Sequence, residues 1–263
     1  MLKKFLETPN DNKIKTITVV AVLCLVCSIF VSASAVALKP IQQKNKQVEK
    51  KTKILEIAGL MERGGDVDEL FKQFTPKVVE LSTGEYVDDI DPTTYDQRKA
   101  AKKPELSVPV GRSDDIASIK RQAKYATVYL VEQDDQVKKI VIPVHGYGLW
   151  STLYGYMALD GDGKTVTGFG FYEHAETPGL GGEVDNPKWK GLWPGKVVYG
   201  ENGDVQLRVV KGNVDPSKPG SEHKVDGLAG ATLTSQGVSN LVQFWLGENG
   251  FGPYLEKFIE RNG

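Results

Sequence analysis

The stretch ATVYLVEQDDQVKKIVIPVHGYG, residues 126–148, predicts the fold of most of the chain. Two runs rich in β-branched and aromatic residues flank a turn at Asp134 and Asp135, which is the pattern of a β-hairpin. Similar runs follow at 153–160 (LYGYMALD), 165–176 (TVTGFGFYEHAE) and 205–212 (VQLRVVKG), separated by turns such as DGDGK and GENGD. We therefore expect a largely antiparallel sheet.

Helix-like segments lie on both sides of these runs. Residues 66–81 carry apolar side chains at helical spacing, with Pro76 as the expected break. Residues 85–110 are polar and are interpreted as a loop. An apolar helix is expected after Ser235 and a short one from Tyr254. The fold class is therefore α+β, with a largely antiparallel sheet and flanking helices.

The bulk composition is that of a globular protein. The 263 residues are 25% charged and 40% hydrophobic, with a net charge of −1. This length suits one large or two small domains. Because there is no basic excess, nucleic acid is not expected as a partner.

Residues 17–38, ITVVAVLCLVCSIFVSASAVAL, form an uncharged run long enough to cross a bilayer as a helix. The sequence ASA at 33–35 leaves a cleaved signal peptide as the alternative, but the run is longer than a typical signal core. We expect an uncleaved single-pass anchor with an N-terminal tail at 1–16, a helical extension at 39–65 and a soluble domain at 66–263.

Lysines on the two sides of this run give little information about orientation. Four precede it and six follow it closely, which by the positive-inside rule alone would leave the soluble domain in the cytoplasm. The rule is weak here, since long downstream domains translocate largely regardless of charge.

Many kinds of catalytic site have no support in the sequence. Both cysteines, Cys24 and Cys27, lie in the apolar run, so the soluble part has no disulfide, thiol nucleophile or cysteine metal site. The histidines at 145, 174 and 223 match no metal spacing, and no catalytic residue or metal ligand is assigned. Nucleophile-elbow, Walker and dinucleotide-binding motifs are absent. The DGDGK run at 160–164 is interpreted as a hairpin turn in preference to a calcium loop.

Two glycine-rich patches remain. In the first, EHAETPGLGGEV at 173–184, glycines let the backbone approach a ligand closely, and Glu176, Thr177, Gly179 and Leu180 form a plausible wall for a flat aromatic ligand. An ordinary wide turn is an equally good interpretation.

The second patch is KVDGLAGATLTS at 224–235, directly before the expected helix. Unpaired amides and the helix dipole at such a start stabilise an anion such as a phosphate. Alternatively, Thr234 or Ser235 simply caps the helix, and Thr232 has no role.

The run DGLAGATLTS is similar to a flavinylation motif, in which a flavin transferase joins FMN to the final threonine of Asp-x-x-Ser/Thr-Gly-Ala-Thr through a phosphoester. Together with ETPGLGG at 176–182 and FWLGENGFGPYL at 244–255, it makes nearly the whole chain resemble the C subunits of the Na+-translocating NADH:quinone reductases. The G subunits of the Rnf electron-transport complexes are a sister family. Ala229 departs from the motif, which usually has Ser or Thr there.

The resemblance implies that Thr232 is the attachment residue and that Asp226, Gly230 and Ala231 complete the motif. Leu233 and Thr234 follow the attachment residue directly. The flavin ring is expected against the first glycine patch, with Trp150 and Thr152 near it.

The function implied is electron transfer on covalent FMN within a membrane complex of the bacterial inner membrane, with the flavin domain periplasmic. The expected partners are the other reductase subunits, which oxidise NADH and reduce quinone, and a flavin transferase. The alternatives are an Rnf-type G subunit and a membrane-anchored binding or scaffold domain without redox activity.

Overall fold

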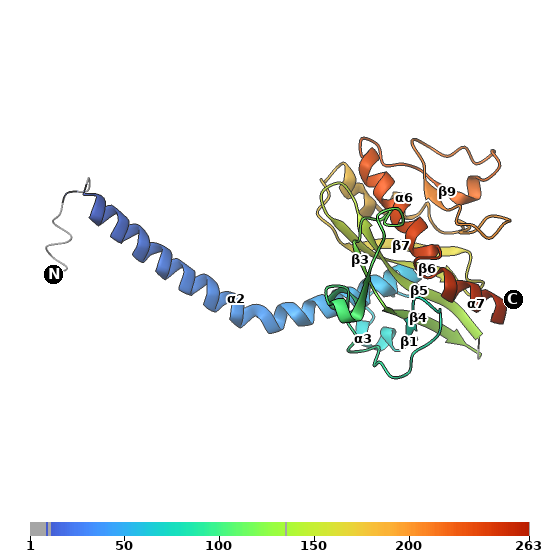
Figure 1. Ribbon diagram of the computed structural model, residues 1–263, viewed down its shortest axis with the longest axis horizontal. Helices are drawn as coiled ribbons and strands as arrows, with labels where there is room; N and C mark the ends of the chain where they lie inside the picture. The colour runs from blue at the N-terminus through green and yellow to red at the C-terminus, as the bar shows by residue number, and fades with distance from the viewer. Residues whose placement is uncertain (1–8, 10–11, 135, 263) are drawn as a thin grey trace. The chain divides into compact units, whose positions relative to one another are not determined.

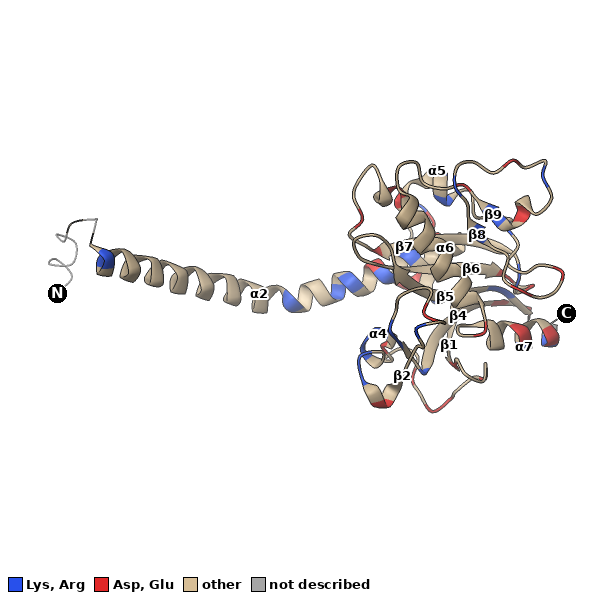
Figure 2. Cartoon of the chain, turned by 45° about the horizontal axis from the view of Figure 1, so that its top comes forward, with Lys and Arg blue, Asp and Glu red and all other residues tan. Residues whose placement is uncertain are grey.

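The computed structural model describes residues 9, 12–134 and 136–262, and the chain divides into two compact units, 1–48 and 49–263. Helix α2 (Lys13–Ala58) begins in the first unit and ends in the second (Figure 1). Asn12 caps it by accepting hydrogen bonds from the amides of Ile14 and Lys15. An 18-residue window of α2 has a mean hydropathy of 2.7 with none of it buried, so α2 is long and apolar enough to cross a membrane. Figure 2 shows basic residues concentrated in the part of α2 that follows this apolar stretch.

The second unit is built on a five-stranded antiparallel sheet in the order β1-β4-β5-β6-β7. Its strands are β1 (Phe74–Glu80), β4 (Tyr125–Gln133), β5 (Gln136–Tyr147), β6 (Thr152–Asp160) and β7 (Val166–Glu173). Strands β4 to β7 follow one another along the chain and pair in that order, so the predicted antiparallel sheet is confirmed.

Shorter elements connect and cover the sheet. They are α3 (Val67–Phe71), α4 (Gln97–Ala100), η1 (Pro104–Leu106), β2 (Ser107–Pro109), β3 (Arg121–Ala123), η2 (Gly181–Asp185), α5 (Pro187–Lys190), β8 (Arg208–Val209), η3 (Ser221–His223), β9 (Lys224–Val225), α6 (Thr232–Leu246) and α7 (Gly252–Asn262). The α+β class with flanking helices is therefore confirmed.

Successive residues of the central strands point to opposite faces of the sheet, and both faces are buried. Ile140, Ile142 and Val144 of β5 pack into the large core beneath α6 and α7. Val141, between them in sequence, packs with the last turns of α2, where Ile54 and Leu55 are completely buried. The globular unit therefore contains the C-terminal end of α2 as part of its core.

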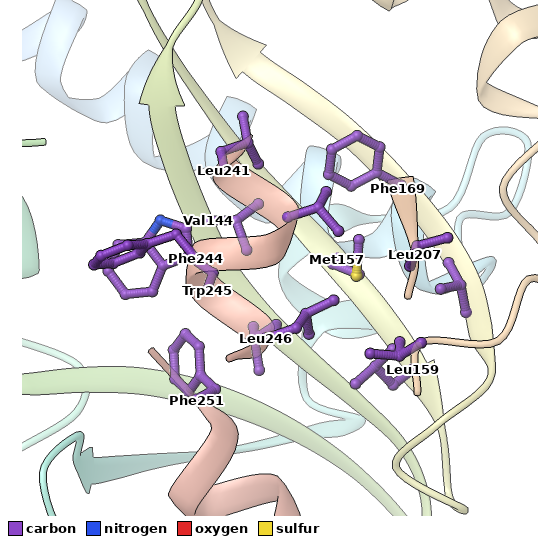
Figure 3. Packing of buried hydrophobic residues seen from close by; sticks show 14 of the residues in the cluster. Val144, Met157, Leu159, Phe169, Leu207, Leu241, Phe244, Trp245, Leu246 and Phe251 are labelled. Carbon is purple, nitrogen blue, oxygen red and sulfur yellow. The ribbon is translucent and has the colours of Figure 1, made fainter. Parts of the chain in front are cut away.

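Helix α6 lies across the sheet and presents an apolar face to it. Figure 3 shows Leu241, Trp245 and Leu246 of α6 packed toward Val144 and Met157 of the strands. The contact is close because glycines stand at the crossing: a Cβ built on Gly237 would lie 2.4 Å from the carbonyl oxygen of Tyr147. This packing fixes the first turn of α6 near the end of β5.

The prediction of a helix at 66–81 is wrong beyond Phe71. Residues Phe74–Glu80 form β1, and Pro76, which has no amide hydrogen, pairs opposite Tyr129. A proline is tolerated there because β1 is an edge strand of the sheet. Apolar residues on both faces of a doubly covered strand produce the misleading helical spacing.

Two other segments differ from the sequence expectation. Of 205–212, only Arg208–Val209 forms a strand, and it pairs in parallel with β9 outside the main sheet. The polar segment 85–110 is mostly loop, as expected, but it also contains α4, η1 and β2. The DGDGK run is a hairpin turn, in which the Asp162 carboxylate accepts hydrogen bonds from the amides of Lys164 and Thr165.

Candidate functional site

The first turn of α6 has no side-chain cap. Its N-cap residue is Ala231, which has no hydrogen-bonding side chain, and the first bond of the helix ladder runs from the Ser235 amide to the Ala231 carbonyl at 2.9 Å. The amides of Thr232, Leu233 and Thr234 precede that bond. They therefore form the positive end of the helix dipole without a capping oxygen from Thr234 or Ser235.

The hydroxyls of Thr234 and Ser235 point to other partners, so the interpretation of either residue as the cap is wrong. Ser235 Oγ accepts a hydrogen bond of 2.9 Å from the Leu228 amide. Thr234 Oγ1 donates to Glu176 Oε2 at 2.7 Å, and both side chains are buried.

Glu176 joins three segments of the chain. Its carboxylate accepts hydrogen bonds from the amides of Trp150 at 2.9 Å, Leu149 at 3.1 Å and Ser151 at 3.2 Å, in addition to the Thr234 hydroxyl. The loop after β5, the loop after β7 and the start of α6 thus meet at one buried carboxylate, which is 5% exposed. We call Glu176, Thr234 and the amides of residues 149–151 the carboxylate clamp.

The clamp favours the ionised form of Glu176. Burial by itself raises the pKa of this carboxyl, but the hydrogen bonds from Thr234 and from the three amides outweigh it. The pKa of Glu176 is therefore below its ordinary value of 4.5.

A second set of bonds ties the same two loops together. The Ala175 amide donates to Ser151 Oγ at 2.7 Å, and the Glu176 amide lies 3.2 Å from His174 Nδ1. His174 Nε2 contacts Asp185 Oδ2 at 2.8 Å, a hydrogen bond that raises the pKa of His174 despite the opposing effect of burial.

Glycines allow the segments to approach so closely. A Cβ on Gly181 would lie 2.5 Å from Thr234 Oγ1 and 2.8 Å from Glu176 Oε2, and one on Gly148 would lie 2.6 Å from Glu176 Oε1. Gly230 has φ +73°, and its Cβ position is 3.1 Å from a methyl group of Leu180. The two glycine patches of the sequence therefore face each other.

Asp226 is bound to the loop before it. Its Oδ1 accepts a hydrogen bond of 2.8 Å from the Val214 amide, and its carbonyl accepts one of 2.9 Å from Trp189 Nε1. Asp226 thus fixes the course of the motif backbone. Ala229, where the motif usually has a hydroxyl, is exposed.

Exposed side chains surround the clamp on its solvent side. Thr232 is exposed, and Leu233, Trp150 and Leu180 are 61%, 65% and 45% exposed. Tyr147 and Leu149 add further exposed apolar surface. A small cleft beside Thr232 is also lined by Lys211, Gly212 and Gln236. The site therefore has an apolar surface next to a threonine hydroxyl at a helix start.

Some residues proposed from the sequence occupy this outer layer, and others lie below it. Thr232, Leu233, Gly230, Leu180 and Trp150 are exposed, as are Thr177 and Gly179 in the loop after β7. Glu176 and Thr234 belong to the clamp, Ala231 is buried, and Thr152 is half-buried at the start of β6.

The sequence interpretation missed the clamp partners Leu149 and Ser151 and the role of Gly148. It included Gly181 in the first glycine patch as a site of close approach to a ligand, whereas Gly181 makes room for the Glu176 carboxylate and the Thr234 hydroxyl. Backbone amides have no signature in a sequence. The sequence shows only that Gly148 and Gly181 are glycines. It does not show that Gly148 meets Glu176 or that Gly181 meets Thr234, because these partners are far apart along the chain.

The globular unit matches a known domain family and known proteins. A family model described as an FMN-binding domain matches residues 148–247, a range that contains all three segments of the clamp. The C subunit of the Na+-translocating NADH-quinone reductase of Pseudomonas aeruginosa is 55% identical over 250 residues, covering 94% of this chain and 96% of that protein. The corresponding subunit of Yersinia pestis is 44% identical over 256 residues, covering 95% of each.

Solved structures agree with these relatives. The crystal structure of Shewanella oneidensis NqrC is 34% identical with a TM-score of 0.73, and the match covers 82% of this chain and 98% of that one. The C subunit of the Na+-translocating NADH-quinone reductase of Parabacteroides distasonis is 26% identical with a TM-score of 0.64, covering 83% and 96%. The chain therefore belongs to the family of the C subunits of Na+-translocating NADH-quinone reductases, and it carries that family's FMN-binding domain.

Proposed function

We propose that the chain holds FMN through a phosphoester to Thr232 and passes electrons between neighbouring cofactors of the reductase. The observation that carries this proposal is the exposed hydroxyl of Thr232 at an uncapped helix start, within the run DGLAGAT at 226–232. Thr234 and Ser235 have hydroxyls at this helix start, but neither caps it. The first amides of α6 therefore remain available to a phosphate.

The residues around Thr232 fit a phosphate-bearing group. The amides of Thr232, Leu233 and Thr234 precede the first helix bond, and Lys211 lines the same cleft as Thr232. Gly230, with its positive φ, lets the chain turn directly before the helix. The single negative charge of the phosphodiester that would join Thr232 to the flavin would be stabilised there by the dipole and by the lysine charge.

The exposed apolar side chains offer a surface for a flat ring. Trp150, Leu180 and Leu233 come from three segments that the carboxylate clamp holds together. Thr177 and Gly179 would border the ring on the loop after β7, while Glu176 and Thr234 would support it from below. When bound, FMN supplies one- and two-electron redox chemistry, and the protein supplies its position and surroundings.

Attachment requires a separate enzyme. A threonine hydroxyl is a poor nucleophile without a base or a metal, and the buried carboxylate of Glu176 is hydrogen-bonded to Thr234. We infer that a flavin transferase provides the base and uses a flavin donor whose phosphate is activated as a phosphoanhydride. The base takes the proton of Thr232 Oγ1 as the bond from this oxygen to phosphorus forms, and the anhydride bond breaks to release the other phosphate group.

We further propose the membrane arrangement expected from the sequence, with a tail at 1–16, a bilayer span at 17–38, an extension at 39–65 and the FMN-binding domain at 66–263 in the periplasm. The apolar stretch of α2 supports the span. Reporter fusions at the C-terminus test the orientation: an alkaline phosphatase fusion should be active, and an active cytoplasmic fluorescent reporter would contradict it.

The attachment is tested on the full chain co-expressed with a flavin transferase. After denaturation in SDS, the wild-type band should fluoresce, and the mass of the peptide containing Thr232 should include the flavin. Thr232→Ala should abolish both signals, whereas Thr16→Ala, far from the site in sequence, should leave both unchanged. A fluorescent Thr232→Ala band would contradict the assignment.

A further inference from the structure

The buried carboxylate of Glu176 accepts more hydrogen bonds than packing against a flavin ring would require. Four donors from two separate segments converge on it: the hydroxyl of Thr234 and the amides of residues 149–151. No lysine or arginine forms an ion pair with it in the described part of the chain. Its negative charge is therefore stabilised by these hydrogen-bond donors, and His174 of the same loop is a titratable group whose raised pKa owes a smaller part to the Glu176 charge.

The donors belong to the same segments that carry the exposed surface. The Trp150 amide and the Trp150 side chain belong to one residue, so fixing the first orients the second. Thr234 lies two residues after Thr232 in the first turn of α6, and Gly181 follows Leu180 directly. Without the carboxylate, the loop after β5 and the start of α6 would lose the acceptor that they share.

We propose that Glu176 is a positioning residue that assembles the flavin-attachment site and keeps a permanent negative charge beneath it. The inference rests on the proposed function at Thr232. It predicts two separable effects: the hydrogen bonds position Thr232 and the ring surface, and the charge makes reduction of the flavin less favourable, because reduction brings negative charge toward a carboxylate in a poorly screened interior.

Two substitutions separate geometry from charge. Glu176→Gln keeps the shape and an oxygen acceptor for the amides of residues 149–151, and its NH2 group can donate to the Thr234 hydroxyl, which then becomes the acceptor. Glu176→Ala removes both the acceptor and the charge. Glu183→Gln is the matched control, because Glu183 lies in the same loop region and its carboxylate accepts from Asn186 Nδ2, at 2.7 Å, outside the clamp.

The full chain is co-expressed with a flavin transferase, and the flavinylated fraction is measured by mass spectrometry and the midpoint potential by spectroelectrochemical titration. Glu176→Ala should lower the flavinylated fraction several-fold. Glu176→Gln should be flavinylated and should have a more positive midpoint potential than wild type. Glu183→Gln should match wild type in both measurements.

Wild-type loading with a wild-type potential in either Glu176 variant would overturn the proposal. Loss of loading in a Glu176→Gln chain that circular dichroism shows to be folded would contradict it, because that variant keeps the positioning hydrogen bonds. If Glu176→Ala does not fold, the potential and loading of Glu176→Gln decide. A wild-type chain without flavin at Thr232 would instead refute the proposed function, so the two failures are distinguishable.

Discussion

Thr232 and Thr234 stand two residues apart in the same helical turn, and their surroundings are opposite. Thr232 is exposed and lines a small cleft with Lys211 and Gln236, whereas Thr234 is 1% exposed and donates to the Glu176 carboxylate. The difference follows from helix geometry, since residues two apart point to nearly opposite sides. One turn of α6 therefore contributes both to the exposed outer layer and to the clamp beneath it.

We expect the largest effect on the clamp from adding a side chain at Gly181. In Gly181→Ala the new methyl would lie 2.5 Å from Thr234 Oγ1 and 2.8 Å from Glu176 Oε2, so the clamp must shift. We expect a loss of about 1–3 kcal/mol in the free energy of unfolding and a large fall in flavin loading. Both are measured, by urea denaturation and by in-gel fluorescence.

Gly195→Ala is the control for that prediction. Gly195 has φ +83° and open space around its Cβ position, so alanine there causes backbone strain of about 1–2 kcal/mol without a steric clash. We expect a comparable loss of stability with normal loading. Equal loading in both variants would show that the site tolerates displacement of the clamp.

Replacing each threonine by valine tests the contrast between them directly. Thr234→Val removes a buried donor to a carboxylate and should cost about 1.5–3 kcal/mol. Thr232→Val, at an exposed position, should change stability by less than about 0.5 kcal/mol. Urea denaturation of the chain without flavin measures both, and similar losses would contradict the assignment of the buried and exposed roles.

The pH dependence of stability should reveal the ionised state of Glu176. Its folded pKa is lowered, so its contribution is present above the ordinary value of 4.5 and is lost as the pH falls through the folded pKa. The gap in unfolding free energy between wild type and Glu176→Gln should therefore narrow on acidification below that value. A gap that is constant over this range would show that Glu176 titrates normally.

Two neighbouring groups also change stability with pH. The pKa of His174 is shifted upward, opposite to the shift of Glu176, and the pKa of Asp185 is shifted downward, as that of Glu176 is. The pKa of His174 is raised by its bond to Asp185, so its contribution is complete below 6.5 and is lost as the pH rises through the folded pKa. Burial raises the pKa of Asp185, but the bond from His174 outweighs this effect and lowers it. The Glu176 charge is a smaller cause of the raised pKa of His174, so Glu176→Gln should also change the His174 contribution. That contribution no longer varies with pH well below 6.5, so the narrowing of the gap below 4.5 still reports Glu176.

The outer layer and the clamp also differ in how far the sequence could predict them. The strands β4 to β7 and the glycine patch before α6 are visible as local patterns, and the exposed threonine follows from a motif. The clamp depends on the amides of residues 149–151, which any residue type supplies, and on a carboxylate more than 20 residues away. Strand β1 was missed because apolar residues on its two buried faces imitate a helix.

The smallest effect is expected at Ala229, where the motif usually has a hydroxyl. Ala229 is exposed, so Ala229→Ser adds a solvated group and should change stability by less than about 0.5 kcal/mol. A hydroxyl that serves the transferase would speed flavinylation without affecting the folded chain, and one that serves the clamp would raise the final flavinylated fraction. Because the clamp closes without any group from residue 229, we expect that final fraction to equal that of wild type, with any gain confined to the initial rate in a time course. A higher final fraction would show that part of the wild-type site is misassembled and that position 229, in addition to Glu176, helps to set its geometry.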